Sequence, residues 1–166
     1  MRYTNSAFIN YYFYNEYYYT RMKDKDFINT LQFGKLYEQK AKEYVDHDEC
    51  EHTEGKVSAY DLIFKKDNTK IKVEVKADRQ AWRYGNICIE IESNNIPSGL
   101  SVTEADYWLY FIVSPDGIND EVYKIPVEDL KNIVDAYRNN ARMIGYNRLS
   151  RCCLIPKGKF KEYLIS

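Results

Sequence analysis

A hairpin predicted at residues 60–78, with the sequence YDLIFKKDNTKIKVEVKAD, is the feature that most constrains the fold of this chain. The Asp-Asn pair at 67–68 tolerates left-handed backbone angles and therefore predicts a two-residue turn between two short apolar strands. The position of the turn fixes the register, because side chains alternate between the two faces of a strand. Asp61 is then expected directly opposite Glu74, with Lys76 two residues further along the same face.

The polar face of this hairpin needs an explanation, whereas the other face is apolar and is predicted to be core (Leu62, Phe64, Val73, Val75). Two carboxylates directly across an antiparallel pair lie about 4.5–5.5 Å apart and repel each other. A hard cation between Asp61 and Glu74 relieves that repulsion, and Mg²⁺ or Mn²⁺ is commonly held by one or two carboxylates. The alternative is a half-exposed strand face on which Lys76 neutralises Glu74.

A helix is predicted upstream, from about Phe27 to Val45, because four small or apolar residues recur there at helical spacing (Leu31, Gly34, Ala41, Val45). Glu38 lies within this stripe. Charged residues are almost never fully buried unless they are paired. Glu38 therefore indicates either a nearby cation or polar cleft, or a side chain at the edge of the stripe that reaches solvent.

The order of these acids along the chain resembles the PD-(D/E)XK nuclease superfamily: Glu38 on a helix, Asp61 on a strand, and Glu74-Val75-Lys76 on the next strand. That superfamily includes restriction endonucleases, Holliday junction resolvases and the nuclease domains of recombination exonucleases. The resemblance covers residues 27–113 and implies an α/β, restriction-endonuclease-like fold, in which helices flank a mixed β-sheet. Tyr60 stands where many members have a proline.

Heavy use of Tyr, Asn, Lys and Ile indicates an AT-rich source such as a phage, a virus or a low-GC bacterium.

The resemblance also implies a role for each residue of the motif. Asp61 and Glu74 are expected to bind Mg²⁺ or Mn²⁺, with the Val75 carbonyl and Glu38 as further ligands. Lys76 is expected to assist the attacking water or the transition state. The implied activity is that of a metal-dependent deoxyribonuclease, an endonuclease rather than an exonuclease, with RNA as an alternative substrate. The other interpretation is a non-catalytic nucleic-acid-binding or assembly protein that retains the fold.

Further elements are predicted downstream from hydrophobic periodicity and capping signals. They are a strand with Ile87, Ile89 and Ile91 on its core face, a short helix around Glu104 to Tyr107, a strand from Trp108 to Val113, a strand at EVYKIP and a helix in PVEDLKNIVDAYRNN. Glu90, on the polar face of the first strand, is either a further acid at the cleft or a solvated side chain.

Charge is unevenly distributed, although the formal net charge is only −1. Residues 131–166 carry eight Lys or Arg against two acids, whereas residues 38–54 carry seven acids against two lysines. A basic flank beside an acidic metal site suits a nuclease, because Lys and Arg neutralise backbone phosphates. The candidate DNA-contacting residues are Arg138, Arg142, Tyr146, Asn147, Arg148 and Arg151, and an ordinary solvated loop is the alternative.

One domain is predicted, with a tyrosine-rich extension at residues 1–26, a motif-bearing core at 27–113 and a basic part at 114–166. The aromatic residues of the extension suit packing against the domain or a dimer contact better than a nucleic-acid platform, because interleaved basic residues are nearly absent. A homodimer is the expected assembly, since such enzymes often dimerise symmetrically.

Four cysteines without Cys-x-x-Cys spacing, and no recognisable signal peptide, predict free thiols in a reducing cytoplasm, that of a host cell if the protein is viral. The cluster HDECEH at 47–52 is interpreted as a charged loop rather than a zinc site. No stretch is long and apolar enough to cross a membrane, so no membrane partner is expected.

Overall fold

The structure, a computed structural model, describes residues 23–53, 59–145 and 148–166. The chain divides into two units, residues 1–33 and 34–166. Of the first unit, the described part is the beginning of helix α2 (Lys23–Ala41). The predicted tyrosine-rich extension lies almost entirely outside the described residues, and the architecture that follows is that of the second unit.

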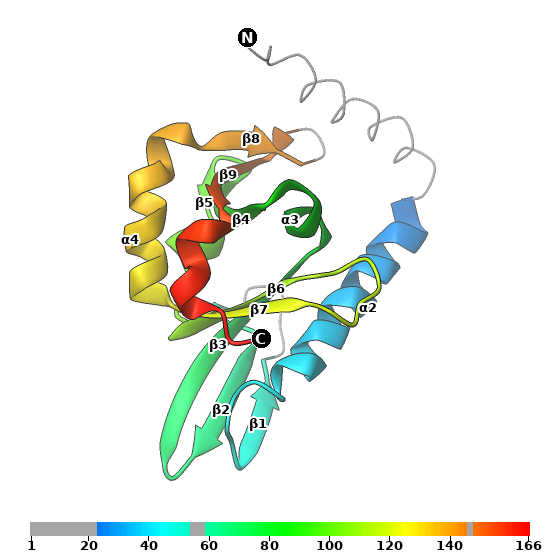
Figure 1. The fold of residues 1–166 in the computed structure, drawn as a ribbon, viewed down its shortest axis with the longest axis vertical. Helices are drawn as coiled ribbons and strands as arrows, with labels where there is room; N and C mark the ends of the chain where they lie inside the picture. The colour runs from blue at the N-terminus through cyan, green and yellow to red at the C-terminus, as the bar shows by residue number, and fades with distance from the viewer. Residues whose placement is uncertain (1–22, 54–58, 146–147) are drawn as a thin grey trace. The chain divides into compact units, whose positions relative to one another are not determined.

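In the described part of residues 34–166, five strands form a mixed sheet in the order β1-β2-β3-β6-β7 (Figure 1). They are β1 (Glu49–His52), β2 (Leu62–Lys66), β3 (Thr69–Asp78), β6 (Tyr107–Ile112) and β7 (Glu121–Pro126). β3 pairs in parallel with β6, and the other neighbours in this sheet are antiparallel. The prediction of an α/β chain with a mixed sheet and helices is therefore confirmed.

The β2–β3 hairpin has the predicted register. Lys66 pairs with Thr69, which leaves Asp67 and Asn68 as a two-residue turn. Both turn residues have positive φ, 47° and 65°, as a type I′ turn requires. The alternating pattern and the turn residues together were sufficient to specify this pairing.

A second sheet, which was not predicted from the sequence, is antiparallel and has the order β5-β4-β9-β8. Its strands are β4 (Asn86–Ser93), β5 (Ile96–Pro97), β8 (Arg142–Ile144) and β9 (Ser150–Pro156). β8 and β9 come from residues 141–166, to which no strand was assigned. β9 pairs along β4 from Pro156 to Ser150, so this segment is largely an integral part of the fold rather than a solvated loop.

Three local predictions were wrong. The segment at 47–52 is not a loop throughout, because β1 pairs with β2 there; its charged side chains suit an exposed edge strand, which explains the loop-like composition. The helix expected around Glu104 to Tyr107 is replaced by a short 3₁₀ helix, η1 (Gly99–Ser101), followed by the start of β6. Finally, α2 ends at Ala41 rather than at Val45.

Of the remaining helices, α4 (Val127–Tyr137) and the 3₁₀ segment η2 (Arg138–Asn140) lie within the predicted PVEDLKNIVDAYRNN helix. Helix α3 (Arg79–Tyr84) and the 3₁₀ segment η4 (Lys157–Tyr163) were not predicted. The four cysteines are free in the structure.

The main core joins the two sheets and α4. Trp108 and Tyr110 of β6 belong to the same buried cluster as Ile89 of β4 and Leu130 of α4. Leu109 and Phe111, which alternate with them, lie on the opposite face of the five-stranded sheet. Residues 34–45 cover that face, as shown by Tyr37, whose ring meets that of Phe111 edge to face with centroids 5.1 Å apart.

Candidate functional site

Strand β3 places an acid and a lysine beside the main core. Glu74 is the register neighbour of Trp108, and Lys76 that of Tyr110, in the parallel pairing of β3 with β6. Register neighbours share a face of the sheet, so both polar side chains lie on the face that carries core aromatic rings. The Glu74 side chain is 12% exposed and that of Lys76 42%. The ammonium of Lys76 lies 5.4 Å from the centroid of the Trp108 ring.

Asp61 lies immediately before β2 and is bonded to β3 through both its backbone and its side chain. Its amide donates to the Val73 carbonyl at 3.0 Å. Its carboxylate oxygen Oδ2 accepts a hydrogen bond of 2.7 Å from the amide of Val75, the residue between Glu74 and Lys76. The structure therefore brings Asp61 to the part of β3 that carries the other two residues of the motif.

Glu74 and Lys76 form an ion pair, with 2.5 Å between Glu74 Oε1 and Lys76 Nζ. Burial raises the pKa of Glu74; Lys76 opposes this effect, whereas the charges of Asp61 and Glu38 add to it. Burial works to lower the pKa of Lys76, but the carboxylates of Glu74, Asp61 and Glu90 outweigh it and raise that pKa above its usual range. In this arrangement Lys76 is a protonated ammonium at neutral pH.

Glu38 reaches the site from α2. Its carboxylate is 3.3 Å from His52 Nδ1 of β1, and its charge contributes to the raised pKa of Glu74. Of the predicted helical stripe, Ala41 is buried and Glu38 is partly exposed, whereas the neighbouring Tyr37, which lay outside the stripe, is buried. Glu38 is thus at the edge of the buried face and contacts His52, and a cation beside it stays a prediction.

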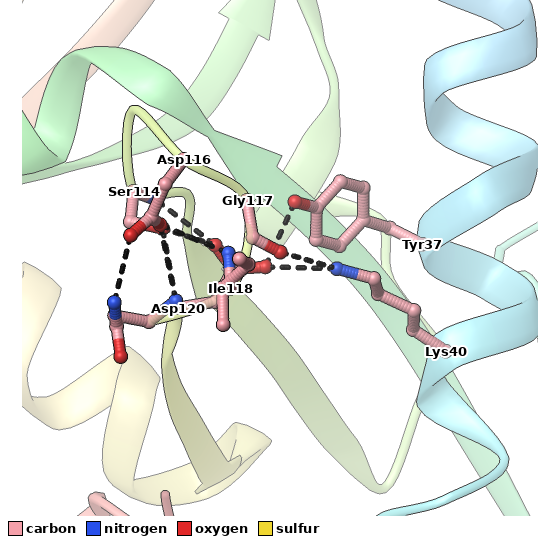
Figure 2. Close-up of polar contacts among 8 residues, drawn as sticks. Tyr37, Lys40, Ser114, Asp116, Gly117, Ile118 and Asp120 are labelled. Carbon is pink, nitrogen blue, oxygen red and sulfur yellow. Dashed lines mark hydrogen bonds and ion pairs between the residues drawn. The ribbon is translucent and has the colours of Figure 1, made fainter.

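The helical turn that carries Glu38 is anchored by a network around Asp120 in the β6–β7 loop (Figure 2). Tyr37 Oη and Lys40 Nζ donate to Asp120 Oδ2 at 2.9 and 3.1 Å. The amide and hydroxyl of Ser114 donate to Asp120 Oδ1 at 2.9 and 3.1 Å. Because Tyr37 directly precedes Glu38, these bonds restrict where the Glu38 carboxylate can lie.

Glu90 approaches the same centre from β4 in the second sheet. The hydroxyl of Ser98 donates to Glu90 Oε1 at 2.8 Å, and the charge of Glu90 acts on the pKa of Lys76. A register shift between Glu90 and Glu92 interrupts the β4–β9 ladder, and such bulges re-aim side chains. The alternation of side chains along β4 predicted that Glu90 lies on the polar face of that strand. No local feature of the sequence could place β4 close to β3.

The predicted DNA-contacting arginines lie on η2 and around the β8–β9 hairpin. Arg138 pairs with Asp135 at 2.9 Å, and Arg151 lies 3.9 Å from Glu92. Arg142 and Arg148 are exposed. In the part of the chain that the structure describes, no ion pair links these arginines to the Asp61–Glu74 centre. Tyr146 and Asn147 lie outside the described residues.

The donor set at this site fits a particular kind of cation. Across residues 23–53, 59–145 and 148–166, no three His, Cys, Asp or Glu side chains are grouped so that they could hold a metal ion. Two carboxylates, from Asp61 and Glu74, still suffice for Mg²⁺, which usually keeps several of its waters. A structural zinc ion needs four protein ligands, so the chemistry fits hydrated Mg²⁺ or Mn²⁺ better. Val75 contributes its amide to Asp61, and a ligand role for its carbonyl stays a prediction.

Among the helices described, none is long and apolar enough to cross a membrane. Comparison of the chain with protein-family models, with curated proteins and with solved structures found no match. Function must therefore be inferred from the chain's own residues and their geometry.

Proposed function

We propose that this protein is a metal-dependent nuclease that hydrolyses phosphodiester bonds in DNA, centred on Asp61, Glu74 and Lys76. The supporting observation is their convergence on one segment of β3. Asp61 accepts the amide hydrogen of Val75, and Lys76 pairs with Glu74 at 2.5 Å. The mixed sheet with flanking helices also agrees with a restriction-endonuclease-like fold of the PD-(D/E)XK type.

The residue types suit this reaction. Asp61 and Glu74 would hold Mg²⁺ or Mn²⁺, which when bound neutralises phosphoryl charge and activates water. Lys76 provides a compact positive charge for the phosphate, the role that its raised pKa favours over that of a proton acceptor. Glu38 and Glu90 add negative charge around the same centre, which favours retention of a cation.

The surroundings of Glu74 also favour cation binding. This carboxylate is largely buried, and the nearby charges of Asp61 and Glu38 disfavour its ionised form. Lys76 relieves only part of that cost. A divalent cation carries twice the charge of an ammonium group and therefore stabilises the ionised Glu74 more strongly.

The backbone phosphates away from the scissile bond are expected to contact exposed arginines. Arg142 and Arg148 are exposed cations that can neutralise backbone phosphates without reading sequence. A homodimer would supply a second such surface and remains part of the proposal.

The experiment is cleavage of plasmid and branched DNA with Mg²⁺ or Mn²⁺. Asp61→Asn and Lys76→Met are each expected to lose at least about 100-fold in rate, the usual cost of removing one preorganised electrostatic group. The matched control is Lys72→Met, because Lys72 is also on β3 and is also ion-paired, with Glu104 at 3.3 Å. Equal cleavage by wild type, Asp61→Asn and Lys76→Met would remove the assignment.

A further inference from the structure

Helix α3 directly follows the strand that carries Glu74 and Lys76, and both its ends are fixed. At its start, the Asp78 side chain accepts hydrogen bonds from the amides of Gln80 and Ala81. At its end, Gly85 adopts a left-handed conformation with φ of 68°. Ala81 is the residue of α3 that is buried. The helix is therefore held in place by its caps and by one small side chain, and its larger side chains point outward.

Those larger side chains include two aromatic rings. Trp82 is 38% exposed and Tyr84 is 37% exposed. The second tryptophan of the chain, Trp108, is only 1% exposed, which is closer to the usual behaviour of this residue type. Trp82 therefore does not pack into the core, and its exposed ring surface can contact a ligand.

Positive groups accompany both rings. The Arg83 guanidinium carbon is 5.6 Å from the centroid of Tyr84, and Lys157 Nζ is 5.9 Å from that of Trp82. The Lys157 amide donates to the Gly85 carbonyl at 2.9 Å, which attaches η4 to the end of α3. We call Trp82, Arg83, Tyr84 and Lys157 the α3 platform.

The charge around this platform is mainly positive. Segment 79–84 contains two arginines and no acid, and segment 157–163 contains three lysines and one glutamate. Two further acids lie beside these segments: Asp78 caps the start of α3, and Glu121 pairs with Lys157 at 2.5 Å and so fixes the position of that ammonium. An anionic partner is thus favoured.

We propose that the α3 platform binds single-stranded nucleic acid, with an unpaired base stacking on Trp82 and the phosphate backbone meeting Lys157. Aromatic rings beside Lys or Arg are the combination that binds single strands with little sequence preference. In a duplex the faces of the bases are stacked on one another, so the rings would gain nothing from it. An acidic peptide would pair with Lys157 but would gain no stacking on Trp82.

This inference rests on the proposed function only in naming the bound strand as the substrate. The platform begins six residues after Lys76 along the chain. A nucleic-acid strand bound there would therefore lie near the C-terminal end of β3, which follows the catalytic motif. Binding itself requires no metal ion. Binding and hydrolysis can therefore be tested separately.

The binding test uses the full chain, a labelled oligo(dT) strand and EDTA to prevent cleavage. Fluorescence anisotropy is expected to show a loss of affinity of about 5- to 150-fold for Trp82→Ala, the range for one base–aromatic stack. Lys157→Gln is expected to weaken binding and reduce its salt dependence. The matched control is Lys124→Gln, because Lys124 also lies over a ring, 5.0 Å from the centroid of Tyr107, but on β7.

A second measurement reads the platform directly. Oligo(dT) is expected to quench the emission of exposed Trp82, whereas emission from buried Trp108 should persist and report that the chain is folded. In Trp82→Phe the quenching should disappear while the remaining emission is unchanged, which separates loss of stacking from loss of folding.

Three results would overturn the inference: no binding of oligo(dT), binding that Trp82→Ala and Lys157→Gln leave unchanged, or equally effective competition by a duplex of the same length. These outcomes differ from failure of the proposed function. In that case oligo(dT) still binds and quenches Trp82, but Mg²⁺ and Mn²⁺ produce no cleavage that depends on Asp61.

Discussion

Asp120→Ala is the substitution whose cost can best be worked out from the structure. The Asp120 side chain is 8% exposed, and it accepts hydrogen bonds from Tyr37, Lys40 and the amide of Ser114, whose hydroxyl hydrogen it shares with Asp116. Lys40 is 32% exposed and can return to water, so its loss costs little. Tyr37 is 2% exposed and Ser114 is 4% exposed, and each hydrogen bond that such a buried donor loses costs about 1–3 kcal/mol.

We therefore expect Asp120→Ala to lower the free energy of unfolding by about 3 kcal/mol, the combined cost of the hydrogen bonds lost by the Tyr37 hydroxyl and the Ser114 amide. Urea denaturation followed by circular dichroism measures this value, with an unchanged dependence on urea concentration expected. Asp116→Ala is the control, because Asp116 also accepts from Ser114 but is exposed. A loss below about 1 kcal/mol, or no larger than for Asp116→Ala, would refute this account of the network.

The same network predicts a pH dependence. Burial works to raise the pKa of Asp120, but the hydrogen bonds from Ser114, Tyr37 and Lys40 outweigh it, so the pKa is lowered. A carboxyl group with a lowered pKa in the folded state stabilises the fold above its unfolded pKa of about 3.9 and loses that contribution as the pH falls. The stability difference between wild type and Asp120→Ala should therefore narrow between pH 5 and pH 2, as seen in repeated urea titrations. A difference independent of pH would show that the carboxylate charge is not what the donors stabilise.

Two further predictions concern the candidate site. Mg²⁺ or Mn²⁺ should raise the melting temperature of the wild type, because a cation that binds only the native state stabilises it. Differential scanning fluorimetry measures this shift, and Glu74→Gln should abolish it. A shift that survives the substitution would place the cation elsewhere. Gly99→Ala should destabilise the chain by about 1–3 kcal/mol, since Gly99 has φ of 52° and an added Cβ would lie 2.5 Å from the Glu90 carbonyl oxygen. Gly145→Ala, with φ of 82° but open space around it, is the control in the same denaturation experiment, and equal losses would show that crowding against Glu90 is unimportant.

The parts of the fold that sequence predicted well depend on neighbours in the chain. The β2–β3 register follows from two turn residues and from alternation, and Ile87, Ile89 and Ile91 are buried in β4 as expected. Such patterns are local, so a single sequence carries them. The same reasoning brought Asp61, Glu74 and Lys76 together, since all three belong to one hairpin.

The parts that were missed depend on contacts between distant segments. β9 pairs with β4 although about sixty residues separate them in the chain, and no periodicity in either strand identifies its partner. β1 is rich in charge because it is an exposed edge, so its composition resembles a loop. The basic residues of the C-terminal part were therefore assigned to one undivided surface, although the structure distributes them over η2, β8, β9 and η4.

The candidate site combines both kinds of information, and this has a consequence for its assembly. Asp61, Glu74 and Lys76 are aligned by the hairpin itself, whereas Glu38 depends on the anchoring of α2 to Asp120, and Glu90 depends on Ser98 and on the close approach of Gly99. The contacts of α2 with Asp120 close a long loop, so their entropic cost is met only when α2 has packed on the sheet. The contacts of Glu90 with Ser98 and Gly99 are local in the chain, and Glu90 acts on Lys76 only when the second sheet has packed beside β3. The hairpin alone can present a pair of carboxylates, but the complete acidic surroundings of Lys76 exist only in the fully folded domain. Variants that loosen the Asp120 network or the Gly99 contact should thus weaken cation binding without touching either of the two carboxylates proposed to hold the ion.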